Sequence, residues 1–105
     1  MKIRKKLYKT IDGYKIYLVN GADVRNTIDI SFTLGNHGFS GDKYVPKHHV
    51  WIDDRLTGVD RKAIMAHELA ETNHMKHGVK YTMAHALATK VEKRVRQGKR
   101  AVIIK

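Results

Sequence analysis

The sequence predicts an α+β fold, in which a small antiparallel or mixed β-sheet of three to four strands precedes two packed helices. The first half of the chain has strand-like alternation broken by turn signals, and the second half has apolar residues at helical spacing. Strands first and helices after them favour α+β over alternating βαβ units. At 105 residues the chain is predicted to be one domain, residues 1–105. Its parts are a sheet part (1–53), a helical part (57–98) and a basic, apolar tail (99–105).

The first two predicted strands form a hairpin. Residues 3–11 and 14–19 are rich in Ile, Tyr, Leu and Val, and Asp12-Gly13 between them is a two-residue signal for a tight turn.

Two further strands are predicted after the turn signal Asn20-Gly21. Residues 27–34 carry an apolar side chain at every second position, which is the pattern of a half-buried strand. Residues 35–47 hold three glycines and the single proline and are predicted to be a loop. A short strand over 48–53 is expected to complete the sheet.

The first predicted helix carries the chemistry discussed below. Thr57 or Asp60 can cap it, and it is expected to run to about His77, where Gly78 provides the usual stop.

The second predicted helix follows closely. Thr82 can cap it, and it is expected to end before Gly98. The tail at 101–104 is apolar and β-branched, so it is predicted to add a strand or to fold back over a cleft. The short connection between the helices predicts that they pack as neighbours.

Composition restricts the function classes. With 21 Lys and Arg against 10 Asp and Glu, the net charge of +11 is suited to nucleic acid, anionic lipid or an acidic protein, although no nucleic-acid-binding motif accompanies it. The absence of cysteine excludes disulfides and thiolate metal sites and leaves His, Asp and Glu as ligands. No stretch has the length of a membrane span, and no apolar core follows the basic start. These features predict a cytoplasmic protein, or a virion-associated one if a phage encodes it.

The first helix carries ionisable residues in an apolar setting. His67, Glu68 and Glu71 fall on one arc, and alanine, leucine and methionine occupy the rest of the helix around them. Burying an imidazole and two carboxylates is unfavourable unless they are paired or bound to a cation. His67 and Glu71 are four residues apart, which lets both side chains reach one ion. They are therefore predicted to be metal ligands.

The second helix supplies a third candidate ligand, His85. Catalytic zinc needs three protein ligands and an open position, so His67, Glu71 and His85 are predicted to bind Zn²⁺. Glu68 is offset by one residue, as is the carboxylate that takes a proton from the zinc-bound water in zinc hydrolases, and is predicted to be the general base. Glu92, two turns after His85, is predicted to orient His85 or another group of the site without binding the metal itself.

These motifs resemble a known group of proteins. The segment from about 45 to 92 contains Trp-Ile-Asp at 51–53, His-Glu-x-x-Glu at 67–71, Gly-x-x-Tyr at 78–81 and Ala-His-x-x-Ala-x-x-x-Glu at 84–92. It is similar to small phage and prokaryotic proteins with a zincin-like pattern and, more loosely, to minimal single-domain gluzincins (minigluzincins). The resemblance implies a zincin-like upper subdomain and a weak or latent zinc metallopeptidase acting on a peptide or protein. The chain departs from that pattern by exchanging two ligand types, because Glu71 stands where zincins have histidine and His85 where gluzincins have glutamate.

A second interpretation stays open. Glu68 and Glu71 could be paired with basic side chains in a satisfied network that serves folding alone. The chain would then be a non-enzymatic basic protein with a structural or nucleic-acid-associated role, of the kind found in phages.

Overall fold

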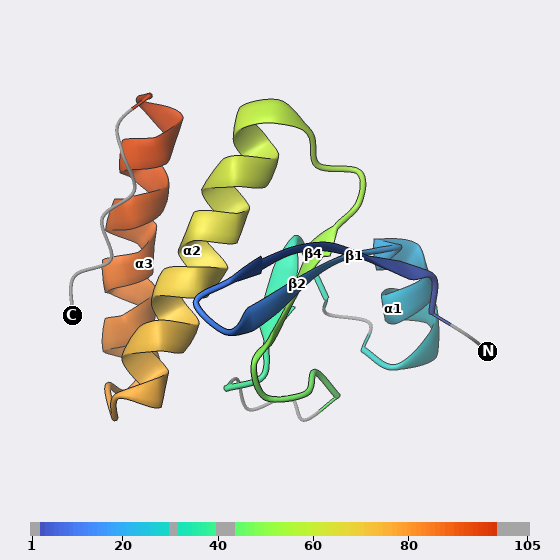
Figure 1. Ribbon diagram of the computed structural model, residues 1–105, viewed down its shortest axis with the longest axis horizontal. Coiled ribbons are helices and arrows are strands. Elements are labelled where there is room, and N and C mark those ends of the chain that lie inside the picture. Colours follow the sequence, from blue (N-terminus) through green and yellow to red (C-terminus); the bar gives the residue numbers. More distant parts are fainter. Residues whose placement is uncertain (1–2, 30–31, 40–43, 99–105) are drawn as a thin grey trace. The chain divides into compact units, whose positions relative to one another are not determined.

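The computed structural model describes residues 3–29, 32–39 and 44–98 and confirms the predicted α+β class. A four-stranded mixed sheet comes first in the chain and two packed helices follow (Figure 1). The chain divides between Leu56 and Thr57 into two compact units, called here the N-terminal and the C-terminal unit. The elements are β1 (Lys5–Ile11), β2 (Tyr14–Val19), α1 (Gly21–Thr27), β3 (Gly35–His37), β4 (His49–Asp53), α2 (Gly58–Lys76) and α3 (Tyr81–Arg96).

The sheet of the N-terminal unit has the strand order β1-β2-β4-β3. β1 and β2 form the predicted hairpin, with Asp12 and Gly13 both at positive φ (50° and 83°), as a tight two-residue turn requires. β4 runs parallel to β2 and antiparallel to β3. β1 is therefore an edge strand, and nearly all of its residues are exposed.

The predicted strand over residues 27–34 is wrong. Thr27 ends helix α1, and no strand is assigned to the described residues of that range; Ile30 and Ser31 lie outside the described residues. α1 begins because the Asn20 side chain accepts a hydrogen bond from the Asp23 amide at 3.0 Å, so Asn20 is a helix cap and not a turn signal.

The predicted loop over residues 35–47 contains a short strand. β3 pairs with β4, and Asn36 lies opposite Trp51. This strand was not predicted because it begins with a glycine, which is unusual in strands. β3 forms through its backbone pairing with β4, and the side chains of β3 do not indicate that pairing.

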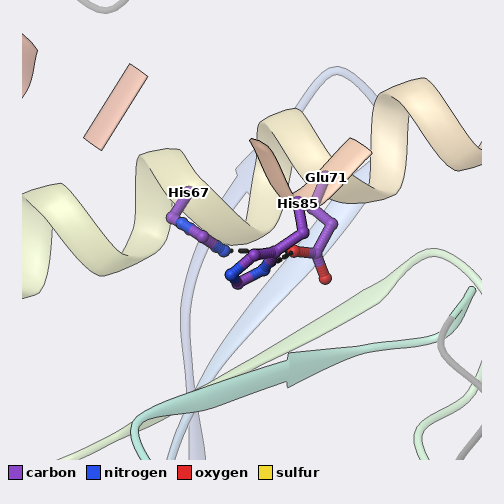
Figure 2. Close-up of side chains that lie close together, drawn as sticks. All are labelled: His67, Glu71 and His85. Carbon is purple, nitrogen blue, oxygen red and sulfur yellow. Dashed lines mark hydrogen bonds and ion pairs between the residues drawn. The ribbon is translucent and has the colours of Figure 1, made fainter. Parts of the chain in front are cut away.

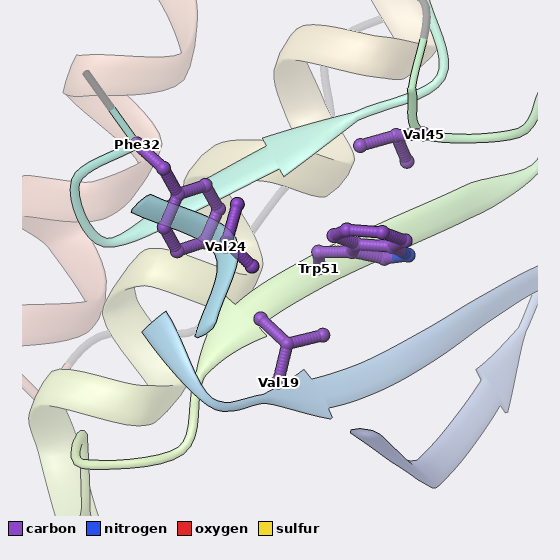
Figure 3. Packing of buried hydrophobic residues seen from close by; sticks show 5 residues of the cluster. All are labelled: Val19, Val24, Phe32, Val45 and Trp51. Carbon is purple, nitrogen blue, oxygen red and sulfur yellow. The ribbon is translucent and has the colours of Figure 1, made fainter. Parts of the chain in front are cut away.

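The core of the N-terminal unit joins α1 to one face of the sheet. Val24 of α1 packs with strand residues and with residues of the following segments (Figure 3). The buried members are Val19, Val24, Phe32, Val45 and Trp51.

Asp53, at the end of β4, is fully buried beneath two arginines. The Arg55 guanidinium donates to both carboxylate oxygens, at 2.8 Å for the closest pair, and Arg25 lies 3.8 Å away. A Cβ at Gly21 would collide with this carboxylate, so glycine is needed where α1 starts. Asp53 thus joins the end of the sheet to α1.

The two helices of the C-terminal unit lie where they were predicted. α2 begins after Thr57, whose backbone is extended, and Gly78 at φ 89° follows its end. α3 begins after Lys80, so the predicted cap at Thr82 is wrong, and Thr82 lies within the first turn. The tail at 99–105, for which a strand or plug was predicted, lies outside the described residues.

Small residues let α2 and α3 approach each other closely. Ala70, Ala88 and Val91 form a buried cluster, and Ala66 packs against it. The helices lie side by side along much of their length (Figure 1). This packing brings polar side chains of both helices to the same place.

Candidate metal centre

The centre begins with one turn of α2. His67 and Glu71 project from the same face, and His67 Nε2 lies 3.1 Å from Glu71 Oε2. Both side chains are buried, at 9% and 6% exposure. Glu68 is also buried, and its Oε2 lies 3.8 Å from the same His67 nitrogen. Helical spacing alone therefore places three ionisable groups around one point.

α3 adds His85 from the neighbouring helix. Its Nδ1 lies 2.8 Å from Glu71 Oε2, so one carboxylate oxygen faces both imidazoles (Figure 2). One nitrogen from each histidine and one oxygen of Glu71 all lie within 4.8 Å of one another. His85 is half exposed, at 50%, which leaves this side of the cluster accessible. The three residues predicted as ligands are thus brought together.

Glu92 lies behind His67. Its Oε1 is 3.0 Å from His67 Nδ1, at ion-pair distance but without hydrogen-bond geometry. The carboxylate therefore faces the imidazole nitrogen that points away from Glu71, and it contacts His67 although it follows His85 on the same helix. A carboxylate on this side of a ligating histidine favours a proton on Nδ1, which leaves the lone pair of Nε2 for a metal.

Arg96 holds Glu92 in place. Its Nε donates to Glu92 Oε2 at 3.1 Å, and its Nη1 donates to Asp60 Oδ1 at 2.6 Å. A connected series of charged contacts thus runs from Asp60 in the first turn of α2, through Arg96 and Glu92 of α3, to His67. Sequence analysis missed Arg96, and the i,i+4 spacing from Glu92 was the signal that could have found it.

Tyr81 also contacts the cluster. Its ring stacks on the His85 imidazole, with centroids 5.5 Å apart and planes 29° apart. Tyr81 is 53% exposed, so it does not fill the space between the helices. It restricts the ring orientation of the one exposed ligand candidate.

The pKa values in this cluster are shifted because several acidic side chains lie close together in a buried environment. Burial and the charge of Glu71 raise the pKa of Glu68 to about 8. Burial lowers the pKa of His67, but its hydrogen bond with Glu71 and the charges of Glu68, Glu71 and Glu92 outweigh burial, so the pKa is raised. Three carboxylates around one imidazole therefore form an environment that favours positive charge.

The donor set fits a small divalent cation. Donor atoms around a tetrahedral zinc lie about 3.3 Å apart, given bonds of about 2.0–2.1 Å. The distances of 3.1 and 2.8 Å from Glu71 Oε2 to the two imidazoles are within a few tenths of an ångström of that spacing. Two nitrogens and one carboxylate oxygen, with one side accessible, therefore form a group that could hold a metal ion.

Two other histidines of the C-terminal unit, His74 and His77, lie near the end of α2. His77 is exposed at the end of α2, and its Nδ1 lies 2.8 Å from the Asn73 carbonyl oxygen. His74 is buried in the last turn of the same helix.

Comparison with known proteins gave no match to a family model, to a curated protein or to a solved structure. Among the described residues, none of the helices combines the length and the apolar character that crossing a bilayer requires.

Replacing Arg96 is expected to weaken zinc binding by this candidate centre without changing any of the candidate ligands. Arg96→Gln releases Glu92, and because partners behind a ligand contribute to its orientation, the affinity for zinc is expected to fall about tenfold. Competition with a chelating dye measures this change. Arg94→Gln removes the same charge from an exposed position in the same turn and should leave the affinity unchanged. An equal loss of zinc affinity in both variants would mean that the net charge of the chain, and not the contact between Arg96 and Glu92, determines the affinity.

Proposed function

We propose that the chain is a minimal zincin-like metalloprotein that binds zinc through His67, Glu71 and His85. The single observation that carries the proposal is the convergence of these three side chains from two helices on one point that is buried on the α2 side and accessible at His85. Zinc is favoured over magnesium or calcium because two of the three donors are imidazole nitrogens. Three protein ligands leave the fourth position of a tetrahedral site for water or substrate.

The proposed activity is weak or latent hydrolysis of peptide bonds. Zinc in this place would act as a Lewis acid and lower the pKa of a coordinated water toward neutrality. Glu68 lies beside the ligands, 3.8 Å from His67 Nε2, where its carboxylate can accept a proton and return it to a leaving amine. Glu92 and Arg96 hold the His67 ring, and Tyr81 restricts the His85 ring.

The second candidate function has an observation of its own. Glu71 Oε2 is within hydrogen-bond distance of both imidazoles, and His67 lies against Glu92, so the cluster is paired without an ion. A network of this kind can serve folding alone. In that case the chain is a non-enzymatic basic protein with a structural or nucleic-acid-associated role.

Glu68→Gln separates the two candidates. Under the first, the variant keeps its zinc, because Glu68 is not one of the proposed ligands, and loses hydrolysis of an unstructured peptide by about a hundredfold or more. Metal content and cleavage of a fluorogenic peptide library are measured on the same samples. Zinc-loaded protein that cleaves no peptide, or a variant that cleaves as well as the parent, would contradict the hydrolytic role.

A further inference from the structure

One face of the β1–β2 hairpin combines cations with aromatic rings. Lys15 pairs with His49 across β2 and β4, and Tyr17 pairs with Trp51 in the same register. Partners in a strand pair and residues two apart on a strand point to the same face, so these four side chains share one face of the sheet. Lys5, opposite Val19 on β1, belongs to this face as well, and at Val19 and Trp51 the same face packs against the core of the N-terminal unit.

Two ring nitrogens on this face are buried and have no hydrogen-bond partner among the described residues. They are the indole Nε1 of Trp51 and Nδ1 of His49. Trp51 is only 3% exposed, and an indole N–H is a donor that cannot act as an acceptor. Buried donors are nearly always satisfied, because an unpaired one costs about 1–3 kcal/mol. The indole N–H of Trp51 is therefore a donor that the described residues leave unsatisfied and that a ligand acceptor would satisfy.

The charge on this face has the opposite sign to that of a phosphate. The Lys5 ammonium lies 5.2 Å from the ring centroids of both Tyr17 and Trp51. Burial lowers the pKa of His49, and the charges of Lys5 and Lys15 lower it further, so both ammonium groups act on this imidazole. Neither lysine forms an ion pair within the described part of the chain. Two cations, an N–H donor and aromatic rings therefore lie around one place.

We propose that this face binds single-stranded nucleic acid, with a backbone phosphate held between Lys5 and Lys15 and facing the Trp51 N–H. Aromatic rings beside a basic surface are suited to strands with unstacked bases, and Tyr17 is not fully buried. The net charge of +11 adds to the attraction of a polyanion. This face and the metal centre have no residue in common, so the proposal does not rest on the proposed metal binding.

The chain has its own reporter for this site, because Trp51 is its only tryptophan. The full chain is titrated with a fluorescein-labelled oligothymidylate, and binding is followed by both dye anisotropy and Trp51 fluorescence. A saturable change in both is expected. The double variant K5Q/K15Q should bind the oligonucleotide about tenfold more weakly. The slope of the logarithm of its binding constant against the logarithm of the salt concentration should become shallower by roughly 0.7 for each lost phosphate contact.

The matched control is K62Q/K90Q, which removes the same charge from two exposed positions of the C-terminal unit. It should keep the affinity and the salt dependence of the parent. Equal weakening in both double variants, or binding without a change in Trp51 fluorescence, would overturn the proposal. So would binding to vesicles of anionic phospholipid, or to inorganic phosphate alone, that is as tight as binding to the oligonucleotide.

Discussion

Zinc at a free concentration of about a hundred times its dissociation constant is expected to raise the free energy of unfolding by about 2.7 kcal/mol. For a chain of this size that corresponds to a rise of roughly 10–20 °C in melting temperature. Glu71→Gln should remove almost all of this rise, because Glu71 Oε2 is the atom that faces both imidazoles and an uncharged amide oxygen is a much weaker zinc ligand. Calorimetry of metal-free and zinc-loaded samples measures the difference.

Asp54→Asn is the control for that experiment. It neutralises an exposed acid in the N-terminal unit and should leave the stabilisation by zinc intact. If zinc raised the melting temperature of Glu71→Gln as much as that of the parent, the metal would be bound elsewhere on the chain.

The metal-free protein is expected to lose stability as the pH rises from about 5 to 8. The pKa of Glu68 is about 8 in the folded chain and near 4.5 when unperturbed, so in this window the folded state holds a proton that the unfolded state has lost. Stability then falls with pH, by at most about 1.4 kcal/mol per pH unit for this one group. The raised pKa of His67 acts in the same direction, because its contribution is complete below its ordinary pKa and is lost as the pH passes the raised value.

Urea unfolding in the presence of a chelator, at a series of pH values, measures this slope. Glu68→Gln carries no titrating group at this position and should have a shallower slope. In the presence of zinc the trend should reverse, because metal binding requires deprotonated ligands. A metal-free stability that stays level or rises between pH 5 and 8 would show that Glu68 is not held protonated in the fold.

The helical half of the chain was predictable because its signals are local. The i,i+4 spacing of His67 and Glu71, the glycine stop after α2 and the short connection to α3 together indicated that His85 would reach the same point. Periodicity and packing distance are enough for such a prediction when two helices are neighbours in sequence. A supporting role was predicted for Glu92, but its contact with His67 was not. That contact depends on how α3 is rotated about its axis relative to α2.

The middle of the N-terminal unit was not predictable in the same way. Residues 27–34 alternate like a strand, but Ile28 and Leu34 are largely exposed, at 48% and 41%, while Phe32 is buried against α1. The Asn20 cap and the packing of Val24 against the sheet determine the helix before this segment. Tertiary packing here overrides a period-two pattern.

Arg96 and Asp60 were missed for a related reason. Each looks like an ordinary charged residue on a helix surface, and Asp60 was considered only as a cap. Their pairing at 2.6 Å joins residues 36 positions apart in sequence, which no local pattern contains. The ion pair becomes visible only when the two helices are placed side by side.

Zinc content is the measurement that tests the metal centre most directly. The purified chain is loaded with zinc, dialysed and analysed by plasma mass spectrometry beside His85→Ala and the control His77→Ala, which changes an exposed histidine at the end of α2. The proposed site predicts about one zinc per chain in the parent and in His77→Ala, and a sharp loss in His85→Ala. No retained zinc in the parent, or equal zinc in all three proteins, would contradict it.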